Sequence, residues 1–158
     1  MLPSLTKVRA EQIIRQMRDC HIVVLGDVML DEFLWGDVTR ISPEAPVPVV
    51  DIKRESTHLG GAANVLANLL ALGAQACVIG VIGDDFAGER IRSSVNDKSA
   101  MQTDGLLIAD NQRPTTIKTR IIAQHQMVVR ADREHRTPVD AQTEGKIVAA
   151  VKTALASA

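Results

Sequence analysis

The sequence has very few aromatic residues and almost no net charge. It contains no Tyr, one Trp and two Phe, so aromatic residues make up 2% of the chain. Proteins that bind single-stranded nucleic acids stack the bases on aromatic side chains. A formal net charge of −1 also provides no excess of positive charge to attract a polyanion. We therefore expect no nucleic-acid partner.

Cysteine is also scarce, and long apolar runs are missing. Cys20 and Cys77 lie far apart, and neither has a His or Cys at the spacing of a zinc site. Reduced thiols fit a cytoplasmic location. No apolar run approaches the roughly 20 residues of a membrane-spanning helix, and the charged N-terminal segment does not resemble a signal peptide. We therefore expect no membrane partner.

The chain does have the composition of a folded domain, with 46% hydrophobic and 23% charged residues among 158. Short continuous apolar runs are typical of buried parallel strands. Such strands are predicted at 21–25, 76–83 and 105–109. Helical spacing of apolar residues predicts helices at 4–19, 65–72 and 86–96. This alternation predicts an α/β fold with a parallel sheet between helices.

Two segments interrupt the alternation with shorter polar and apolar runs. Residues 31–58 contain Gly36-Asp37, which we interpret as the turn of a hairpin, and prolines that place the next strand at a sheet edge. Residues 114–133 alternate around a turn at 124–126, which predicts a second hairpin. We expect both segments to form a small β sheet outside the main one.

The last predicted helix follows Thr137-Pro138, a pair that suits the N-cap and first position of a helix. In a parallel sheet, another strand is expected after such a helix. Only about three core strands precede it, whereas sheets commonly have about five or six. We therefore expect the 158 residues to be the first half of a domain.

The stretch Leu-Gly-Gly-Ala-Ala-Asn at 59–64 joins an extended segment to an apolar helix. Backbone N–H groups at a helix N-terminus favour oxygen-rich ligands, and the Asn64 amide offers both a donor and an acceptor. Two interpretations are open at this point. Gly60 and Gly61 form either a tight packing turn or a ligand cradle. Asp27, which follows the first strand at its carboxyl end, favours the cradle, because α/β sheets bind ligands there.

Five stretches closely resemble the ribokinase-like (PfkB) sugar kinases. They are residues 26–31, 40–50, 60–65, 80–85 and 113–120. The Gly-Gly-x-x-Asn element at 60–64 is typical of the whole superfamily. The stretches 41–50 and 114–120 resemble its D-glycero-β-D-manno-heptose-7-phosphate kinase branch, the kinase half of a bifunctional heptose kinase/adenylyltransferase.

This resemblance implies a ribokinase-like, Rossmann-type parallel sheet with helices on both faces and a small β lid. The core would comprise 1–30, 59–112 and 134–158, and the lid 31–58 and 114–133. The implied reaction transfers phosphate from ATP, with Mg2+, to the anomeric hydroxyl of D-glycero-D-manno-heptose 7-phosphate. The product is the 1,7-bisphosphate of lipopolysaccharide core synthesis. Because the lid of relatives often pairs with its copy in a second subunit, the resemblance also implies a homodimer.

The resemblance also assigns roles to individual residues. Asp27 and Asn64 would bind sugar hydroxyls, while the backbone of Gly60 and Gly61 closes on the sugar. Asp31 would assist them or form a salt bridge of the lid. The residues that would hold the sugar phosphate, or alternatively form a solvated basic strand face, are Lys118, Arg120 and Arg130. Asp84 and Asp85 are expected to cap the next helix and not to bind a metal.

The family's general base is the Asp of a Gly-Ala-Gly-Asp motif, at a helix N-terminus that binds the transferred phosphate. No Gly-Ala-Gly-Asp occurs in these 158 residues, so we predict no catalytic residue and only a small part of the ATP site. The chain is expected to hold the sugar but to be inactive alone. The alternative is a non-catalytic sugar-phosphate-binding or dimerisation fragment.

Overall fold

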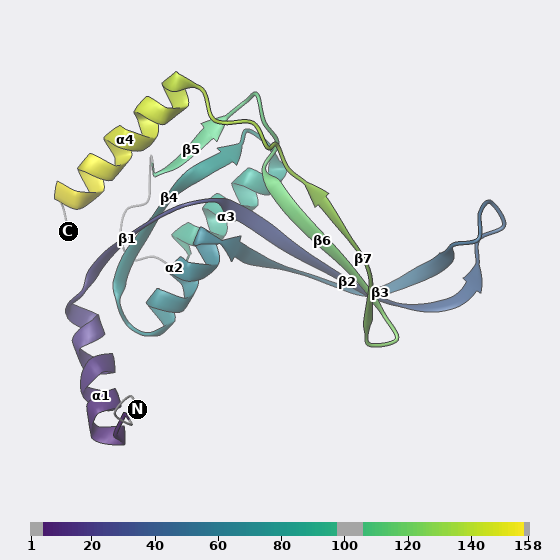
Figure 1. The fold of residues 1–158 in the computed structure, drawn as a ribbon, viewed down its shortest axis with the longest axis horizontal. Helices are drawn as coiled ribbons and strands as arrows, with labels where there is room; N and C mark the ends of the chain where they lie inside the picture. Colours follow the sequence, from purple (N-terminus) through teal and green to yellow (C-terminus); the bar gives the residue numbers. More distant parts are fainter. Residues whose placement is uncertain (1–4, 98–105, 157–158) are drawn as a thin grey trace.

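The computed structural model of the chain describes residues 5–97 and 106–156. Figure 1 shows a layered α/β body from which a long β sheet extends. The helical segments are α1 (Lys7–Gln16), the short 3-10 helix η1 (Met17–Asp19), α2 (Ala62–Ala71), α3 (Phe86–Asn96) and α4 (Ala141–Ala156). The strands are β1 (His21–Leu25), β2 (Val28–Ile41), β3 (Pro48–Gly61), β4 (Gln75–Gly83), β5 (Leu107–Asp110), β6 (Thr116–Ala123) and β7 (Gln126–Arg133).

The layered body is built on a parallel sheet with the strand order β1-β4-β5. Helices α2 and α3 pack on one face through Leu66 and Ile91, which meet Val78 of β4 in one buried cluster. Helix α4 packs on the other face, where Ala150 joins a second cluster with Ile79. Strand β4 is therefore buried on both sides, which explains its continuous apolar sequence.

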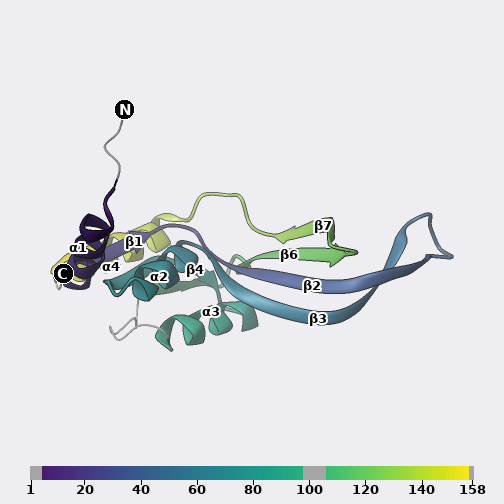
Figure 2. The same ribbon diagram turned by 90° about the horizontal axis from the view of Figure 1, so that it is seen from below.

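The extended part is a four-stranded sheet with the order β3-β2-β6-β7. Strands β2 and β6 run parallel, and the two outer pairs are antiparallel. Seen from below, this sheet projects from the body as a long arm (Figure 2). Every residue of β7 is exposed, so one edge of the sheet is open to solvent in this chain. We call this unit the four-stranded sheet.

The predicted α/β class, with helices on both faces of a parallel sheet, is confirmed. The strands expected at 21–25 and 76–83 and the helix at 86–96 are present at nearly those bounds. The third strand is observed at Leu107–Asp110, and the start of its predicted range lies outside the described residues. The hairpin predicted within 114–133 is also confirmed, as β6 and β7.

The hairpin predicted around Gly36-Asp37 is wrong. Strand β2 runs through both residues, and the chain reverses between Ser42 and Val47, whose backbones are hydrogen-bonded at 2.8 Å. Gly36 lies at a register shift between β2 and β3, where an added Cβ would come within 2.3 Å of the Asp51 carbonyl oxygen. The glycine thus permits close approach of two strands at a bulge and does not form a turn.

The predicted start of the last helix at Thr137-Pro138 is also wrong. Helix α4 begins at Ala141, and the Asp140 carboxylate caps it by accepting the Thr143 N–H at 2.7 Å. The bond from the Thr143 backbone holds the pKa of Asp140 below its usual range. Arg113 donates to the carbonyl oxygens of Thr137 and Pro138 at 3.3 and 3.1 Å, which keeps both in the preceding loop.

Asp85 joins the two sheets. It caps α3 as predicted, accepting the Gly88 N–H at 2.8 Å, and it also accepts the N–H and hydroxyl of Thr115 at 2.9 and 2.6 Å. The Thr115 hydroxyl in turn accepts the Gly83 N–H at 2.8 Å, and Thr115 is 1% exposed. The end of β4 and the start of β6 are therefore held together by one part-buried carboxylate and one buried hydroxyl.

Candidate functional site

The site is built where β3 ends and α2 begins. Gly61 adopts a φ of 56°, and an added Cβ would lie 2.2 Å from the carbonyl oxygen of Asp27. An added Cβ on Gly60 would lie 2.6 Å from Oδ2 of Asp31. The Asp27 carbonyl also accepts the Ala62 N–H at 2.8 Å. Glycine is thus required at position 61, where the chain passes directly against the Asp27 backbone, and Gly60 leaves room for the Asp31 side chain.

A hollow of about 310 Å³ lies beside this turn. Its lining comes from β2, β3 and α2: Asp31, Phe33, Trp35, His58, Leu59 and Asn64. The rings of Phe33 and Trp35 stack with centroids 5.5 Å apart. The hollow therefore combines a carboxylate and an amide with an aromatic surface, a combination suited to a small ligand that has both hydroxyl groups and apolar faces.

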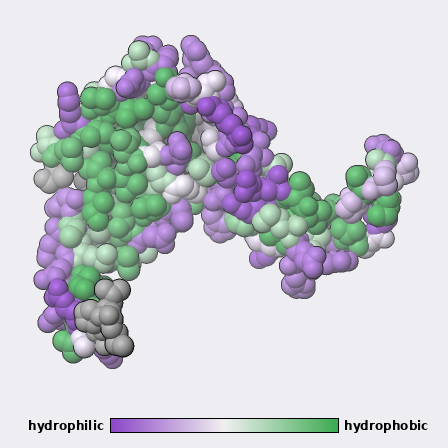
Figure 3. Space-filling model, viewed as in Figure 1, coloured by the Kyte–Doolittle hydropathy of each residue, from purple (hydrophilic) through white to green (hydrophobic). Residues whose placement is uncertain are grey.

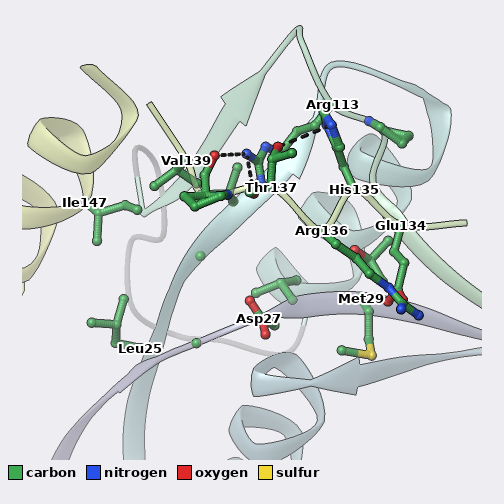
Figure 4. A pocket seen from close by; sticks show the side chains of 17 residues that line it. Leu25, Asp27, Met29, Arg113, Glu134, His135, Arg136, Thr137, Val139 and Ile147 are labelled. Atoms are coloured by element: carbon green, nitrogen blue, oxygen red, sulfur yellow. Dashed lines mark hydrogen bonds and ion pairs between the residues drawn. The ribbon is translucent and has the colours of Figure 1, made fainter. Parts of the chain in front are cut away.

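Asp27 lies in a second, larger hollow of about 690 Å³ at the carboxyl end of β1. Figure 4 shows Asp27 in this hollow beside Met29, with the segment containing Arg136 and Thr137 across from it. Among the residues that the structure describes, no hydrogen bond or ion pair reaches the Asp27 carboxylate. The structure thus places Asp27 and Asn64 at different hollows.

The three predicted basic residues share one face of the four-stranded sheet. In the β2–β6 register, Lys118 lies opposite Asp31, and Arg120 lies opposite Phe33. On the next strand, Arg130 lies directly opposite Arg120. Because paired residues of neighbouring strands project from the same face, all three basic residues lie on the side that bears Asp31 and Phe33.

Each of these basic side chains is paired with a carboxylate. Arg120 binds Oδ1 of Asp31 at 2.6 Å. Arg130 donates to both oxygens of Asp132 at 2.9 and 3.0 Å, and Lys118 lies 3.4 Å from the same carboxylate. The bonds from Arg130 hold the pKa of Asp132 below its usual range despite partial desolvation. Figure 3 shows a polar zone where the four-stranded sheet leaves the body.

Sequence reasoning missed the roles of Phe33, Trp35 and His58 in the hollow. Asp31, Phe33 and Trp35 alternate along β2, so an uninterrupted strand places them on one face. The period-two pattern was therefore available in the sequence. It was obscured because Gly36 was interpreted as a turn.

The resemblance to sugar kinases implies Mg2+ beside ATP. Within residues 5–97 and 106–156, no group of three or more His, Cys, Asp or Glu side chains is arranged to hold a metal ion. These residues do not fit a resident magnesium site. Over the same ranges, no helix is long and apolar enough to cross a membrane.

Comparison with known proteins gives consistent results. The pfkB family carbohydrate kinase profile matches residues 20–157. The bifunctional protein HldE of Pelobacter propionicus is 46% identical over 137 residues, which cover 87% of this chain and 28% of that protein. The bifunctional protein HldE of Helicobacter hepaticus is 50% identical over 131 residues, covering 80% and 26%. The chain thus spans little more than a quarter of the length of these relatives.

The fold comparison agrees with the sequence comparison. Arabidopsis thaliana ribokinase, solved in complex with ribose and ATP, superposes with a TM-score of 0.54 at 20% identity. The match covers 70% of this chain and 34% of the ribokinase chain. At this identity the likeness establishes the ribokinase-like fold.

Proposed function

The chain belongs to the pfkB family of carbohydrate kinases, and from that premise we propose that it holds the acceptor sugar of an ATP-dependent phosphoryl transfer. The proposed acceptor is D-glycero-D-manno-heptose 7-phosphate, phosphorylated at its anomeric hydroxyl to the 1,7-bisphosphate. This reaction would serve ADP-heptose and lipopolysaccharide core synthesis in the cytoplasm. One observation carries the proposal: a hollow with hydroxyl-binding groups lies on the same sheet face as three basic side chains.

Sugar binding is supported by the chemistry around the Gly60–Gly61 turn. The carboxylates of Asp27 and Asp31 accept hydrogen bonds from hydroxyls, and bonds to an ionised acceptor are the strong ones. The Asn64 amide both donates and accepts. Sugars also have apolar C–H faces, and the rings of Phe33 and Trp35 line the same hollow, with Arg54 stacked over the Trp35 ring at 3.8 Å from its centroid. Each kind of group on the sugar thus has a counterpart in the chain.

The phosphate of the acceptor is assigned to Lys118, Arg120 and Arg130. Guanidinium groups bind phosphate through two parallel hydrogen bonds, and an ammonium adds a point charge. The Arg120 and Lys118 side chains are each 20% exposed, which leaves them accessible to a ligand. Lys118 and Arg120 lie on β6, which pairs with β2 beside the hollow, and Arg130 lies one strand further out on β7, on the same face.

The same proposal divides the chain into a core of 1–30, 59–112 and 134–158 and a lid of 31–58 and 114–133. The lid corresponds to most of the four-stranded sheet. We further propose that the lid pairs with its copy in a homodimer. The open edge of β7 supports this, as do the exposed side chains of Met127, Val128 and Val129.

We do not propose that these 158 residues alone phosphorylate the acceptor. In-line phosphoryl transfer requires a positioned base and stabilisation of the transferred charge. The family's Gly-Ala-Gly-Asp motif for both tasks does not occur in this sequence. We assign no catalytic residue, and we propose that this polypeptide binds the acceptor without phosphorylating it.

Titration calorimetry with heptose 7-phosphate tests the proposal. We expect saturable binding, and Asn64→Ala should weaken it about tenfold, because the loss of one ligand hydrogen bond costs about 1–1.5 kcal/mol. Asn111→Ala is the matched control, since Asn111 lies in a turn beyond β5 and should leave the affinity unchanged. Absence of binding, or equal weakening by the control, would refute the acceptor site. Turnover with added ATP would refute the inactivity of the chain.

A further inference from the structure

Two arginines face each other across the β6–β7 pair. Arg120 and Arg130 are direct register partners, and like charges in that arrangement destabilise a sheet. Each guanidinium is compensated by a different carboxylate, Asp31 for Arg120 and Asp132 for Arg130. An anion placed between the two arginines would provide the same compensation. Binding a phosphate here therefore competes with ion pairs that the chain already contains.

The Arg120–Asp31 pair occupies the carboxylate that lines the small hollow. Oδ1 of Asp31 accepts from Arg120 at 2.6 Å, and Oδ2 is packed against Gly60. A sugar hydroxyl that approaches from the hollow therefore competes with Arg120 for Oδ1. Arg120 lies between the two lining residues, since its guanidinium carbon is 5.1 Å from the centroid of the Phe33 ring. Both charged side chains are about one-fifth exposed, so a ligand can reach the pair.

We propose that the Arg120–Asp31 ion pair is exchanged on binding and selects phosphorylated sugars. The phosphate of the ligand binds Arg120, and the Asp31 carboxylate that Arg120 leaves accepts a hydrogen bond from a hydroxyl of the same ligand. This inference rests on the proposed acceptor site. A sugar without phosphate offers Arg120 no new partner. Its binding must therefore break the Arg120–Asp31 ion pair without compensation. Arg120 thus contributes twice to selectivity, by holding the phosphate and by blocking Asp31 when phosphate is absent.

The exchange predicts a coupling that the unmodified chain can reveal. Inorganic phosphate should tighten the binding of unphosphorylated heptose, because it draws Arg120 away from Asp31. Such couplings between two ligands are reciprocal and typically amount to about fivefold or more. The titration is run in phosphate and in chloride at equal ionic strength. Phosphate that leaves heptose binding unchanged, or that weakens it, would overturn the exchange.

Arg120→Gln gives a second test whose two effects have opposite signs. Binding of heptose 7-phosphate should weaken by about tenfold or more, because a charge-assisted bond is lost. Binding of unphosphorylated heptose should strengthen, because Asp31 is freed. If Arg120 only contacts the phosphate, the affinity for the unphosphorylated sugar should not change. If the substitution distorts the site, the affinities for both sugars should fall. Either of these results would count against the exchange.

Arg130→Gln is the matched control. Its partner Asp132 does not line the small hollow, so only binding of the 7-phosphate should weaken. If the unmodified chain binds heptose 7-phosphate but shows neither the coupling nor the opposite effects, the exchange is wrong and the proposed function stands. If heptose 7-phosphate does not bind at all, both fail. Should Arg120→Gln not fold, the phosphate titration of the unmodified chain decides.

Discussion

The two sheets of this chain are stabilised in different ways. In the parallel sheet, β4 lies between helices on both faces, and Val78 and Ile79 are fully buried. In the four-stranded sheet, β7 is exposed at every residue, and ion pairs and strand hydrogen bonds connect the neighbouring strands. The proposed phosphate ligands all belong to the second sheet. The comparison indicates that apolar burial holds the fold, while the residues proposed to select the ligand lie where burial is least.

Typical energies support this division. Full burial of an aliphatic side chain contributes about 1.5–3 kcal/mol, whereas exposed ion pairs contribute about 0–1 kcal/mol each. Weak pairs can change partners without threatening the fold. Segments that respond to ligands come from the less stable parts of proteins for this reason. The Arg120–Asp31 pair is only about one-fifth exposed, so its exchange is proposed for a ligand that supplies a new partner to each charge.

The largest contrast between the sheets should appear on truncation of one apolar residue in each. Ile79→Ala creates a cavity at a fully buried position and should lower the free energy of unfolding by about 2–5 kcal/mol. Val129→Ala removes a side chain that is 47% exposed and should change it by less than about 0.5 kcal/mol. Urea unfolding of both variants measures the difference. Similar losses would show that the two sheets do not differ in this way.

The sequence predicted the parallel sheet well because burial leaves a local pattern. The apolar run of β4 and the helical spacing in α3 each lie within about ten residues and need no distant partner to be recognised. Asp85 was likewise recognised as a cap, since a cap bonds to a residue of the next turn. The core strands and the cap of α3 are such local features and were found at nearly the observed positions, whereas the cap of α4 is Asp140 and not the predicted Thr137.

The four-stranded sheet was harder to predict because its features depend on distant residues. Gly36 resembles a turn until Asp51 is known to lie against it. The Asp31–Arg120 pair joins two strands that are far apart in the sequence. Phe33 and Trp35 line a hollow only once β3 and α2 close its other side. The types of site residues could thus be predicted, but their partners and their division between two hollows could not.

The junction between the sheets should show the next largest effect. Asp85→Ala removes the cap of α3 and leaves the N–H and hydroxyl of buried Thr115 without their acceptor. We expect a loss of about 2–3 kcal/mol in the free energy of unfolding. Asp84→Ala, at the adjacent exposed position, is the matched control and should be nearly neutral. Equal effects at the two positions would show that Asp85 does not join the sheets.

Acid provides a second measurement of the same junction. Burial by itself raises the pKa of Asp85, but hydrogen bonds from Thr115 and Gly88, with the charge of Arg133, outweigh it and hold the pKa below its usual range. The stabilisation is therefore complete above the unfolded pKa of about 3.9 and is lost as the pH falls through the lower native pKa. Asp85→Ala should lose this part of the acid dependence, whereas Asp84→Ala should retain it.

The smallest effect is expected far from the junction, at the Asp51–Lys53 ion pair on β3. Both side chains are more than half exposed, so water and salt screen their attraction, although the pair raises the pKa of Lys53. Lys53→Ala should therefore leave the urea midpoint unchanged, at both low and high salt. If this variant is instead destabilised as much as Asp85→Ala, an exposed ion pair within one strand contributes far more than screening by water and salt allows. Such a result would remove the energetic contrast between apolar burial in the parallel sheet and ion pairs in the four-stranded sheet.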